Sequence, residues 1–583
     1  MKYSAIPTAQ SIVQHCQAKN ISNIVISPGS RNAPLTIAFA ENPFFNCYSI
    51  VDERCAAFFA LGLAQQLQVP IVVLCTSGSA LLNYYPAVAE AYFSNIPLVV
   101  ISADRPIYKL GIGDGQTINQ QNVFKNHIGY SANLKQDVRH ATEKVLHYKP
   151  EWIIDEHVRE VQQKVQSYND DELNHAFEIA INLNQPVHIN APFEEPLYNT
   201  LTENIITPRI DAVKVGEVTQ PNIEYHKNIW NVAVRKMILV GVSTPGTVKD
   251  YILEHLANDP SVLVLTETTS NIHHPNFFNS IDSLIAPIEM HDNKIEQFNQ
   301  LQPDVLVTFG GLIVSKKVKA FLRKYKPEHH WHIGGQQAND TFFCLEEHIK
   351  VSVNTFFDKM YADSIVLKSD YFEKWNQVKQ KFEQKRDLYL KEIPFSDFLA
   401  FSEILKSVPN EYMLQLANSS TIRYTQLFNF NTTLKVFCNR GTSGIDGSTS
   451  TAIGASIGNN SPTLFITGDL SFFYDSNALW NNYIKSNFRI IVINNNGGGI
   501  FRILPGKENS DVFETYFETR HTLTAEHLCS MYGLDYRKAK STQELQDELS
   551  YFFKESTRPQ LLEITTPALK NDKILIDYFR FIS

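Results

Sequence analysis

The stretch "ITGDLSFFYDSNALWNNYIKSNFRIIVINNNGGGIF", residues 466–501, contains the pattern from which the fold class is predicted. One apolar run ends in Gly468-Asp469, and a second apolar run ends in three asparagines followed by three glycines. Short apolar runs bounded by turn residues are typical of buried strands in parallel sheets. We therefore expect strands over 462–468 and 489–493.

A helix over 475–486 is expected to connect these two strands. Two adjacent parallel strands joined by one right-handed crossover deliver their carboxyl ends side by side. The connection therefore predicts that Asp469 lies near Asn494–Asn496, so that an acid and a cluster of amides share one edge of a sheet.

Similar Val/Ile/Leu runs alternate with helical stretches along the chain, which is typical of βαβ units in doubly wound parallel sheets. The polar stretch 199–235 and the charged helical segment 371–393 separate them into three blocks. The runs are 23–30, 47–53, 70–79, 97–106 and 186–192 in the first block, 237–242, 262–268 and 304–311 in the second, and 412–420, 435–441, 462–469, 489–496 and 560–567 in the third. A chain of 583 residues is too long for one core. We expect three α/β domains, over 1–195, 200–360 and 370–583.

Composition limits the classes of function. The chain has a formal net charge of −9, with 43% hydrophobic and 19% charged residues. An acidic chain without a Lys/Arg block does not fit broad nucleic-acid binding. The start, "MKYSAIPTAQSIVQHC", has no apolar signal core, and no later apolar run has the length of a membrane span. The seven cysteines form no CxxC pair, so we expect reduced thiols in a cytoplasmic protein.

Most of the predicted strands end in a polar or glycine-rich cluster: SPGSR, DER, TSGS, ADRP, ANSS, NRG, GD and NNNGGG. Ligands bind beyond the carboxyl ends of strands in open parallel sheets. Because these clusters belong to the first and third blocks, we expect two sheets to face one site, with the middle block as a spacer.

Asp469 and the Asn/Gly cluster offer a carboxylate, an amide oxygen and a backbone carbonyl, which are hard oxygen ligands suited to Mg²⁺. Glycines in the turn let the backbone approach a ligand closely. On spacing alone, an Asn/Gly-rich turn without a metal is an open alternative.

Gly-Asp, followed after the crossover by Asn-Asn and Gly, resembles the diphosphate-binding motif of thiamine-diphosphate (ThDP) enzymes. The resemblance implies pyrimidine-binding, central and diphosphate-binding domains, an architecture that covers the whole chain. It also implies that Asp469 and Asn495 are side-chain ligands, and Gly497 a carbonyl ligand, of Mg²⁺ or Mn²⁺. The chain departs from the generic Gly-Asp-Gly motif at Leu470.

The same resemblance implies a catalytic glutamate at a strand end of the first block, and "SIVDERCAAFFALGLA" (49–64) places Glu53 there. In ThDP enzymes this glutamate faces N1′ of the aminopyrimidine and favours the imino tautomer, whose N4′ removes the C2 proton. Taken alone, Glu53 is also consistent with an acid that begins a helix and interacts with its macrodipole.

Four stretches resemble one branch of the ThDP enzymes: "ISPGSRNAPLT" (26–36), "SADRP" (102–106), "RGTSGIDGSTSTAIG" (440–454) and "GDLSFFYDSNAL" (468–479). This branch is the MenD family, the 2-succinyl-5-enolpyruvyl-6-hydroxy-3-cyclohexene-1-carboxylate synthases of menaquinone biosynthesis, in which leucine follows Gly-Asp. The resemblance implies a transferase that decarboxylates 2-oxoglutarate on ThDP and adds the resulting succinyl carbanion to isochorismate. It also implies a homodimer, or a dimer of dimers, in which ThDP bridges the pyrimidine-binding domain of one subunit and the diphosphate-binding domain of its partner.

Both substrates of that family are dicarboxylates, so an acidic protein needs a local cluster of bases to bind them. Arginine is favoured because its planar fork matches a carboxylate. The candidates lie at strand ends or, for the two lysines, after "TFGGLIVS" in the middle block: Arg31, Arg105, Arg423, Arg440, Lys316 and Lys317. The family pattern there is Lys-Arg, so Lys317 replaces a fork with a point charge. Each base alone is also consistent with a solvated surface charge.

Neutral residues complete the set that the resemblance implies. Those for the cofactor are Asn418, Ser443, Ile445, Leu470 and Ser471, with Ile445 as the apolar residue that holds ThDP bent. Those for the substrates are Ser30, Gln116, Ser419, Ile500 and Phe501. Each is also consistent with an ordinary loop hydrogen bond or a core contact.

Rival motifs are weaker. "GIGDG" (111–115) lacks the strand and helix of a dinucleotide fingerprint, and "PGKEN" (505–509) lacks the Ser/Thr that follows the lysine of a P-loop. The histidines at 273–274, 329–330 and 332 lack the ligand spacing of a zinc site, so we expect surface or packing roles. Two alternatives stay open: a pyruvate-using ThDP synthase or decarboxylase, and a regulatory protein on this fold that no longer binds ThDP.

Overall fold

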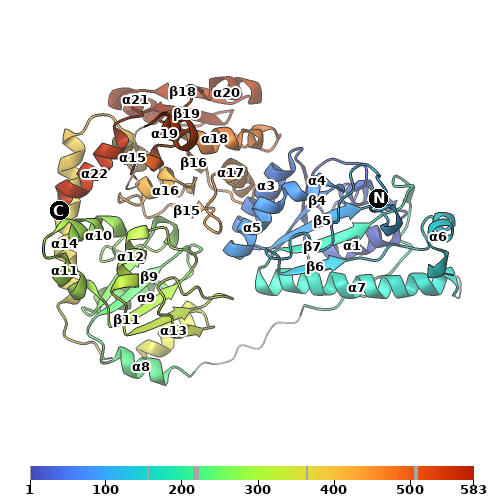
Figure 1. Ribbon diagram of the computed structural model, residues 1–583, viewed down its shortest axis with the longest axis horizontal. Helices are drawn as coiled ribbons and strands as arrows, with labels where there is room; N and C mark the ends of the chain where they lie inside the picture. The colour runs from blue at the N-terminus through green and yellow to red at the C-terminus, as the bar shows by residue number, and fades with distance from the viewer. Residues whose placement is uncertain (1, 154–155, 214–221, 363–364, 504–509) are drawn as a thin grey trace. The chain divides into compact units, whose positions relative to one another are not determined.

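The computed structural model describes residues 2–153, 156–213, 222–362, 365–503 and 510–583 (Figure 1). The chain forms two compact units. Unit 1 comprises residues 1–216, 441–460 and 474–485, and unit 2 comprises residues 217–440, 461–473 and 486–583. The P-loop-like segment 505–509 lies outside the described residues.

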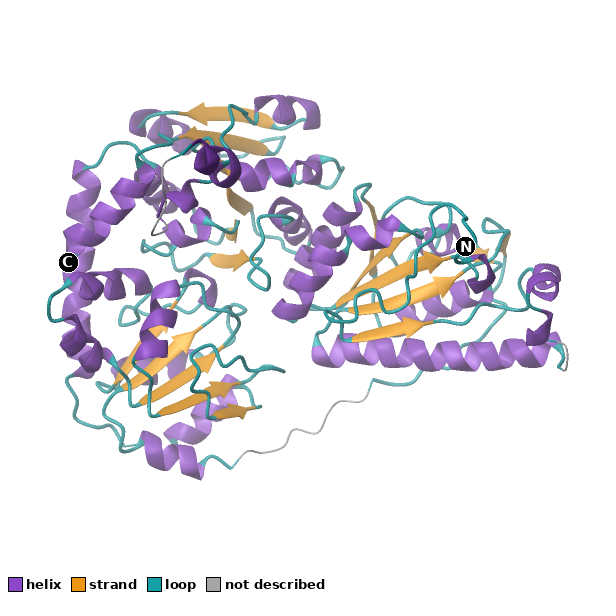
Figure 2. Cartoon of the chain, in the orientation of Figure 1, coloured by secondary structure: helices purple, strands orange, loops and turns teal. Residues whose placement is uncertain are grey.

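Unit 1 contains a six-stranded parallel sheet in the order β3-β2-β4-β5-β7-β6 (Figure 2). Its strands are β2 (Asn23–Ile26), β3 (Asn46–Ser49), β4 (Ile71–Cys75), β5 (Leu98–Asp104), β6 (Tyr130–Asn133) and β7 (Val187–Pro192). A short antiparallel pair, β1 (Tyr3–Ser4) and β8 (Thr200–Leu201), lies apart from it. The inner strands are almost wholly buried, as expected for a parallel sheet that helices cover on its faces.

The helices of unit 1 include one from the third block. They are α1 (Pro7–Ala18), α2 (Ala33–Ala40), α3 (Glu53–Leu67), α4 (Ser79–Asn83), α5 (Tyr85–Ser94), α6 (Thr142–Tyr148), α7 (Val158–Leu183) and α17 (Ser448–Ile457). α17 packs closely on α3, and two glycines permit this. A Cβ on Gly62 would lie 2.0 Å from the Thr451 carbonyl oxygen, and one on Gly454 would lie 2.0 Å from the Phe59 carbonyl oxygen. α17 is thereby anchored to the first block.

The middle block, in unit 2, forms a five-stranded parallel sheet in the order β10-β9-β11-β12-β13. Its strands are β9 (Lys236–Val240), β10 (Val262–Thr266), β11 (Val305–Phe309), β12 (His329–Ile333) and β13 (Glu347–Ile349). Its helices are α8 (Glu224–Trp230), α9 (Asp250–Asn258), α10 (Ile281–Met290), α11 (Lys294–Leu301), α12 (Lys316–Lys324) and α13 (Val353–Tyr361).

The third block forms a six-stranded parallel sheet in the order β15-β14-β16-β17-β19-β18. Its strands are β14 (Met413–Leu416), β15 (Lys435–Cys438), β16 (Thr463–Gly468), β17 (Phe488–Asn494), β18 (Asp535–Ala539) and β19 (Gln560–Thr565). Its helices in unit 2 are α14 (Tyr371–Glu392), α15 (Asp397–Ser407), α16 (Ser420–Thr425), α18 (Asp469–Tyr474), α19 (Asp511–Phe513), α20 (Glu526–Tyr532), α21 (Thr542–Phe552) and α22 (Asn571–Ile582).

One apolar core joins the two sheets of unit 2. α10 packs against both α14 and α22, and these two helices also contact each other. Tyr578 of α22 is fully buried, with its hydroxyl 2.9 Å from Ser283 Oγ of α10. The middle block is thus fixed to the third block.

Three parallel α/β sheets confirm the predicted fold class. The domain boundaries at 1–195, 200–360 and 370–583 stay predictions, since the two compact units cut the chain differently. None of the described helices has the length and apolar character needed to cross a membrane.

The predicted crossover helix over 475–486 was wrong. The crossover begins with α18, and the predicted segment holds only a 3₁₀ turn, Ser476–Leu479. Asn481 explains part of this, because its Nδ2 donates to the Ala478 carbonyl (2.6 Å) and its Oδ1 accepts from Tyr483 N (2.8 Å). Such side-chain bonds to backbone compete with helix formation.

Candidate functional site

The carboxyl ends of β16 and β17 meet as predicted, with Gly468 paired to Ile493 in the parallel register. Asp469 is 3% exposed, and its Oδ2 accepts from Gly497 N at 2.9 Å. Its Oδ1 accepts from Leu470 N at 2.7 Å. Gly497 has φ +144°, and a Cβ there would lie 2.5 Å from the Glu518 carbonyl oxygen, so this turn requires glycine.

Asn495 presents an acceptor toward the same place. Its Nδ2 donates to Asp397 Oδ2 at 2.9 Å, while its Oδ1 is buried without a hydrogen-bond partner among the described residues. A buried acceptor without a partner is costly unless a ligand satisfies it. The Asp469 carboxylate, the Asn495 Oδ1 and the Gly497 carbonyl are hard oxygen donors, so the residues present fit Mg²⁺ or Mn²⁺.

Asp397 and His521 border these donors and were not predicted. Burial, together with the nearby Asp469 charge, raises the pKa of the Asp397 carboxyl to about 6, although Thr566 Oγ1 donates to Asp397 Oδ1 at 2.5 Å. His521 Nε2 lies 3.2 Å from Asp469 Oδ2. Asp397 begins α15 after its N-cap Ser396, and His521 lies in a loop, so neither follows a strand. The strand-end rule could not identify them.

The loop after β14 connects two predicted residues. Asn418 Nδ2 donates to the Asn439 carbonyl at 2.7 Å, and Asn418 Oδ1 accepts from Arg440 Nη1 at 2.7 Å. Ser419, next in the chain, adopts φ +69°, which a non-glycine residue seldom does. The structure therefore brings Asn418 and Arg440 together at the carboxyl ends of β14 and β15.

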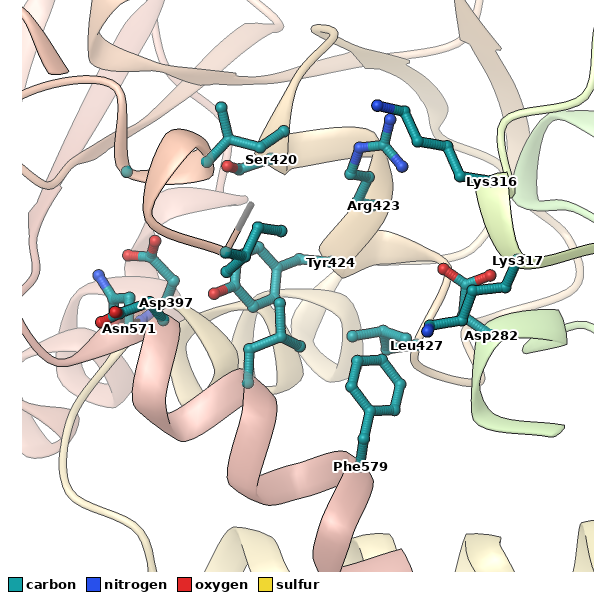
Figure 3. A pocket seen from close by; sticks show the side chains of 15 residues that line it. Asp282, Lys316, Lys317, Asp397, Ser420, Arg423, Tyr424, Leu427, Asn571 and Phe579 are labelled. Carbon is teal, nitrogen blue, oxygen red and sulfur yellow. Dashed lines mark hydrogen bonds between the residues drawn. The ribbon is translucent and has the colours of Figure 1, made fainter. Parts of the chain in front are cut away.

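A cavity of about 250 Å³ lies beside this loop in unit 2 (Figure 3). Its lining includes Asp282, Lys316, Lys317, Asp397, Ser420, Arg423, Ile500 and Phe579. Lys316 and Arg423 extend toward one another in Figure 3. Burial lowers the pKa of Arg423, and the Asp282 carboxylate opposes that change. The cavity combines cations with an apolar wall, as a site for a small anion with a carbon chain requires.

The middle block contributes the two predicted lysines, Lys316 and Lys317, to this cavity, and also Asp282, which was not predicted. Lys317 Nζ donates to Glu289 Oε2 at 2.5 Å, so the Lys317 charge is already compensated by an ion pair. Ile500 lines the cavity, whereas Phe501 is not among the lining residues and its ring lies 6.1 Å from that of Phe517.

In unit 1, Glu53 is the first residue of α3 and is partly exposed. Asp52 caps the helix by accepting from Cys55 N at 3.2 Å. Glu53 is close enough to Cys75 and Tyr84 for its charge to raise the pKa of both groups, after burial. Glu53 therefore follows β3, the strand after which it was predicted, and its charge acts on Cys75, the last residue of β4.

The predicted bases of unit 1 already bond to protein groups. Arg31 is 5% exposed and donates to the Phe193 carbonyl (3.1 Å) and to Glu195 Oε1 (3.2 Å). Arg105 donates through Nε and Nη2 to the Gly115 carbonyl at 3.1 and 2.7 Å, next to Gln116. Ser30 and Gln116 are exposed, and Gln116 has φ +54°.

The loop carrying Ser443 and Ile445 also belongs to unit 1. Buried Glu90 of α5 accepts from Gly441 N at 2.7 Å and from Thr442 N at 2.6 Å, which fixes the start of this loop. Ile445 is 38% exposed, as a side chain that meets a ligand can be.

The predicted cofactor residues thus fall into two groups. Glu53, Ser443 and Ile445 belong to unit 1, and Asn418, Asp469, Leu470, Ser471, Asn495 and Gly497 belong to unit 2. Ser471 is 4% exposed within α18.

Comparison with known proteins agrees with this geometry. The N-terminal TPP-binding domain of thiamine pyrophosphate enzymes matches residues 6–130, and the C-terminal TPP-binding domain matches residues 418–564. The chain is 55% identical over 584 residues to 2-succinyl-5-enolpyruvyl-6-hydroxy-3-cyclohexene-1-carboxylate synthase of Christiangramia forsetii and 53% identical over 583 residues to that of Flavobacterium johnsoniae. Both alignments cover 100% of each chain. The Porphyromonas gingivalis synthase is 36% identical, with 97% of this chain and 96% of the relative covered.

Proposed function

Since the chain belongs to the 2-succinyl-5-enolpyruvyl-6-hydroxy-3-cyclohexene-1-carboxylate synthase family of ThDP enzymes, we propose that it decarboxylates 2-oxoglutarate and transfers the succinyl unit to isochorismate in menaquinone biosynthesis. The observation that carries this proposal is the junction, in unit 2, of an oxygen-donor cluster with a cationic cavity. Asp397 belongs to both, because it holds Asn495 and also lines the cavity with Arg423 and Lys316.

The cofactor residues have distinct tasks in this proposal. When bound, ThDP would supply an electron sink for decarboxylation. Asp469, Asn495 and the Gly497 carbonyl would hold the divalent cation that neutralises the diphosphate, with Asn418, Ser443, Leu470 and Ser471 as further contacts. Glu53 would hold and move a proton at its carboxyl oxygen, beside the aminopyrimidine. Ile445 would supply apolar support for the cofactor.

The bases divide between the two substrates. Arg423, supported by Lys316, Arg440 and Ser419, binds the distal carboxylate of 2-oxoglutarate from the cavity of unit 2. Arg31 and Arg105, with Ser30 and Gln116, bind isochorismate from unit 1. Lys317 would first have to leave Glu289, so we assign it a smaller contribution than Lys316. Ile500 and Phe501 provide the apolar wall beside the reacting carbons.

We also propose a cytoplasmic homodimer, or a dimer of dimers. All seven cysteines, each among the described residues, are reduced thiols, which suits a reducing compartment. The dimer follows from the family, in which cofactor groups from two chains act together.

The test is release of ¹⁴CO₂ from 2-[1-¹⁴C]oxoglutarate by the full chain with ThDP and Mg²⁺, with and without isochorismate. We expect turnover that isochorismate accelerates, with the succinylated cyclohexene product detected by mass spectrometry. Turnover of pyruvate in preference to 2-oxoglutarate would instead favour another ThDP decarboxylase or synthase. A protein whose melting temperature does not respond to ThDP and Mg²⁺ would contradict cofactor binding.

A further inference from the structure

Glu267, just after β10 in the middle block, is a buried acid that the proposed reaction does not use. It is 2% exposed, and its carboxylate accepts three hydrogen bonds from two backbone groups that precede α12, besides the capping bond from the Ser270 backbone in its own 3₁₀ turn. Val314 N donates to Oε1 (2.9 Å) and Oε2 (2.7 Å), and Ser315 N donates to Oε1 (2.7 Å). Glu267 therefore fixes the turn that immediately precedes α12.

A second acid holds the same turn. The Ser315 hydroxyl accepts from Val318 N at 3.1 Å, which caps α12, and it donates to Asp282 Oδ1 at 2.5 Å. Asp282 follows Ile281 at the start of α10 and lines the cavity of unit 2. Two carboxylates from two different elements thus determine where α12 begins.

The first residues of α12 are the cavity residues Lys316 and Lys317. Cations are disfavoured at a helix N-terminus, where the macrodipole is positive. Lys319, one helical turn after Lys316, adds a third cation. Repulsion within this group, and between it and Arg423, would push the helix start out of the cavity unless something fixed it. The carboxylate of Glu267 supplies both the hydrogen bonds and the compensating charge.

We propose that Glu267 is a positioning residue that holds the start of α12 so that Lys316 meets Arg423 in the dicarboxylate cavity. The inference rests on the proposed function, because it assigns the cavity to a substrate carboxylate. The charged groups that act on Glu267 are Asp282 of α10, Lys319 of α12, Arg423 of α16 and Arg440 after β15.

Loss of the Glu267 charge changes the affinity for a dicarboxylate in opposite directions, depending on how Glu267 acts. If Glu267 acted only through its charge, its removal would make the cavity more positive, and a dicarboxylate would bind more tightly. If Glu267 acts by position, the two N–H groups keep only one acceptor oxygen between them, the turn shifts, and Lys316 leaves the dicarboxylate. A purely structural role would change stability and leave affinity unchanged.

The pH dependence adds an independent measurement. Burial raises the pKa of the Glu267 carboxyl to about 7, opposed by the hydrogen bonds from Val314 and Ser315. A protonated carboxyl has one acceptor oxygen fewer, so positioning predicts weaker dicarboxylate binding as pH falls from 8 to 6. Removing the titrating group should flatten this profile.

The probe is glutarate, an unreactive dicarboxylate, titrated calorimetrically into the full chain saturated with ThDP and Mg²⁺. We expect Glu267→Gln to weaken glutarate binding about tenfold, the equivalent of one charge-assisted contact. The KM for 2-oxoglutarate should rise in parallel while kcat stays within about threefold. The affinity of the variant should change less between pH 6 and 8 than that of wild type.

Asp259→Asn is the matched control. Asp259 is 6% exposed, precedes β10 at the opposite edge of the same sheet, and accepts from Ser261 N at 2.9 Å and from Lys236 Nζ at 3.4 Å. The Asp259→Asn substitution should lower the melting temperature without changing glutarate affinity. If Glu267→Gln does not fold, Ser315→Ala tests the same turn and should weaken glutarate binding at least about threefold, since it removes the hydrogen bond from Val318 N and the one to Asp282.

Glutarate binding in the Glu267 variant as tight as in wild type, or tighter, would overturn the positioning role while leaving the proposed function intact. A wild-type protein that releases no CO₂ from 2-oxoglutarate and binds no glutarate would overturn both.

Discussion

The hydrogen bond from Asn495 Nδ2 to Asp397 Oδ2 offers a prediction about metal affinity that can be tested without turnover. Asp397 lies 2% exposed and fixes one end of the Asn495 amide, so the other end, Oδ1, is the group available to a cation. Asp397→Ala removes this anchor and one buried negative charge near the oxygen donors. The amide of Asn495 can then rotate and present its NH₂ group, which cannot bind a cation.

Loss of such an orienting partner typically reduces metal affinity about 10- to 100-fold. This range corresponds to about 1.4–2.7 kcal/mol. It agrees with the roughly 1.5–3 kcal/mol expected for one hydrogen bond to a charged group. The assay is titration of the full chain with Mn²⁺ at saturating ThDP, with free Mn²⁺ followed by electron paramagnetic resonance.

A swap of the two residues supplies the control. Asp397→Asn combined with Asn495→Asp keeps the number of atoms, the net charge and one N–H···O hydrogen bond, now donated in the opposite direction. Mn²⁺ affinity should return to within about threefold of wild type, the loss expected from imperfect geometry. Asn495→Asp alone places two carboxylates face to face and should destabilise the protein. The reasoning is refuted if Asp397→Ala retains wild-type Mn²⁺ affinity, or if the swap binds no better than Asp397→Ala.

Four further predictions follow from the site. Glu53→Gln should bind ThDP within a few-fold of wild type but lose roughly 10²-fold or more in turnover, the scale of general acid–base help; near-normal turnover would remove Glu53 from catalysis. Mixing Glu53→Gln with Asp469→Ala subunits should restore up to about a quarter of the activity if chains pair randomly in a symmetric dimer, and no recovery despite verified exchange would count against a shared site. Arg105→Ala should still decarboxylate 2-oxoglutarate but stall before carbon–carbon bond formation, whereas Arg423→Ala should fail earlier. Each variant should lose about 2–4 kcal/mol of transition-state binding, measured from kcat/KM. The reverse order of failure would exchange the two assignments. Burial lowers the pKa of His188 to about 3. The contribution of neutral His188 to stability is therefore present above pH 6.5 and is lost as pH falls from 6.5 toward 3, where the free energy of unfolding of wild type should fall faster than that of His188→Gln by up to about 1.4 kcal/mol per pH unit. Equal slopes would show that His188 is not held neutral.

The sequence predicted every inner strand of the three sheets except β12, because each of the others is a continuous apolar run. Within the three parallel sheets, the strands that it did not predict are β6, β12, β13 and β18, which read YSAN, HHWHI, EHI and DYRKA. Three of them are edge strands, which have one neighbour and tolerate polar residues. β12 is different, because Thr308 Oγ1 lies 3.0 Å from His330 Nε2 and 3.0 Å from His332 Nδ1, so its polar side chains are satisfied inside the block. Periodicity does not reveal a strand whose buried histidines depend on a partner elsewhere in the chain.

The residues of the candidate site also fall into a predictable and an unpredictable class. Residues that meet a ligand directly, such as Asp469 and Asn495, follow strands and could be predicted from position and chemical type. Glu267 and Asp397 act on other protein groups, so their residue type says nothing about their task. Each is a buried carboxylate that accepts N–H donors from a different element, and only the fold identifies those donors. In water such an acid is an ordinary surface charge, but in a buried position it must be satisfied, and the partner that satisfies it is thereby held in place. The same burial that makes these acids costly therefore makes them able to orient the residues that bind the ligand.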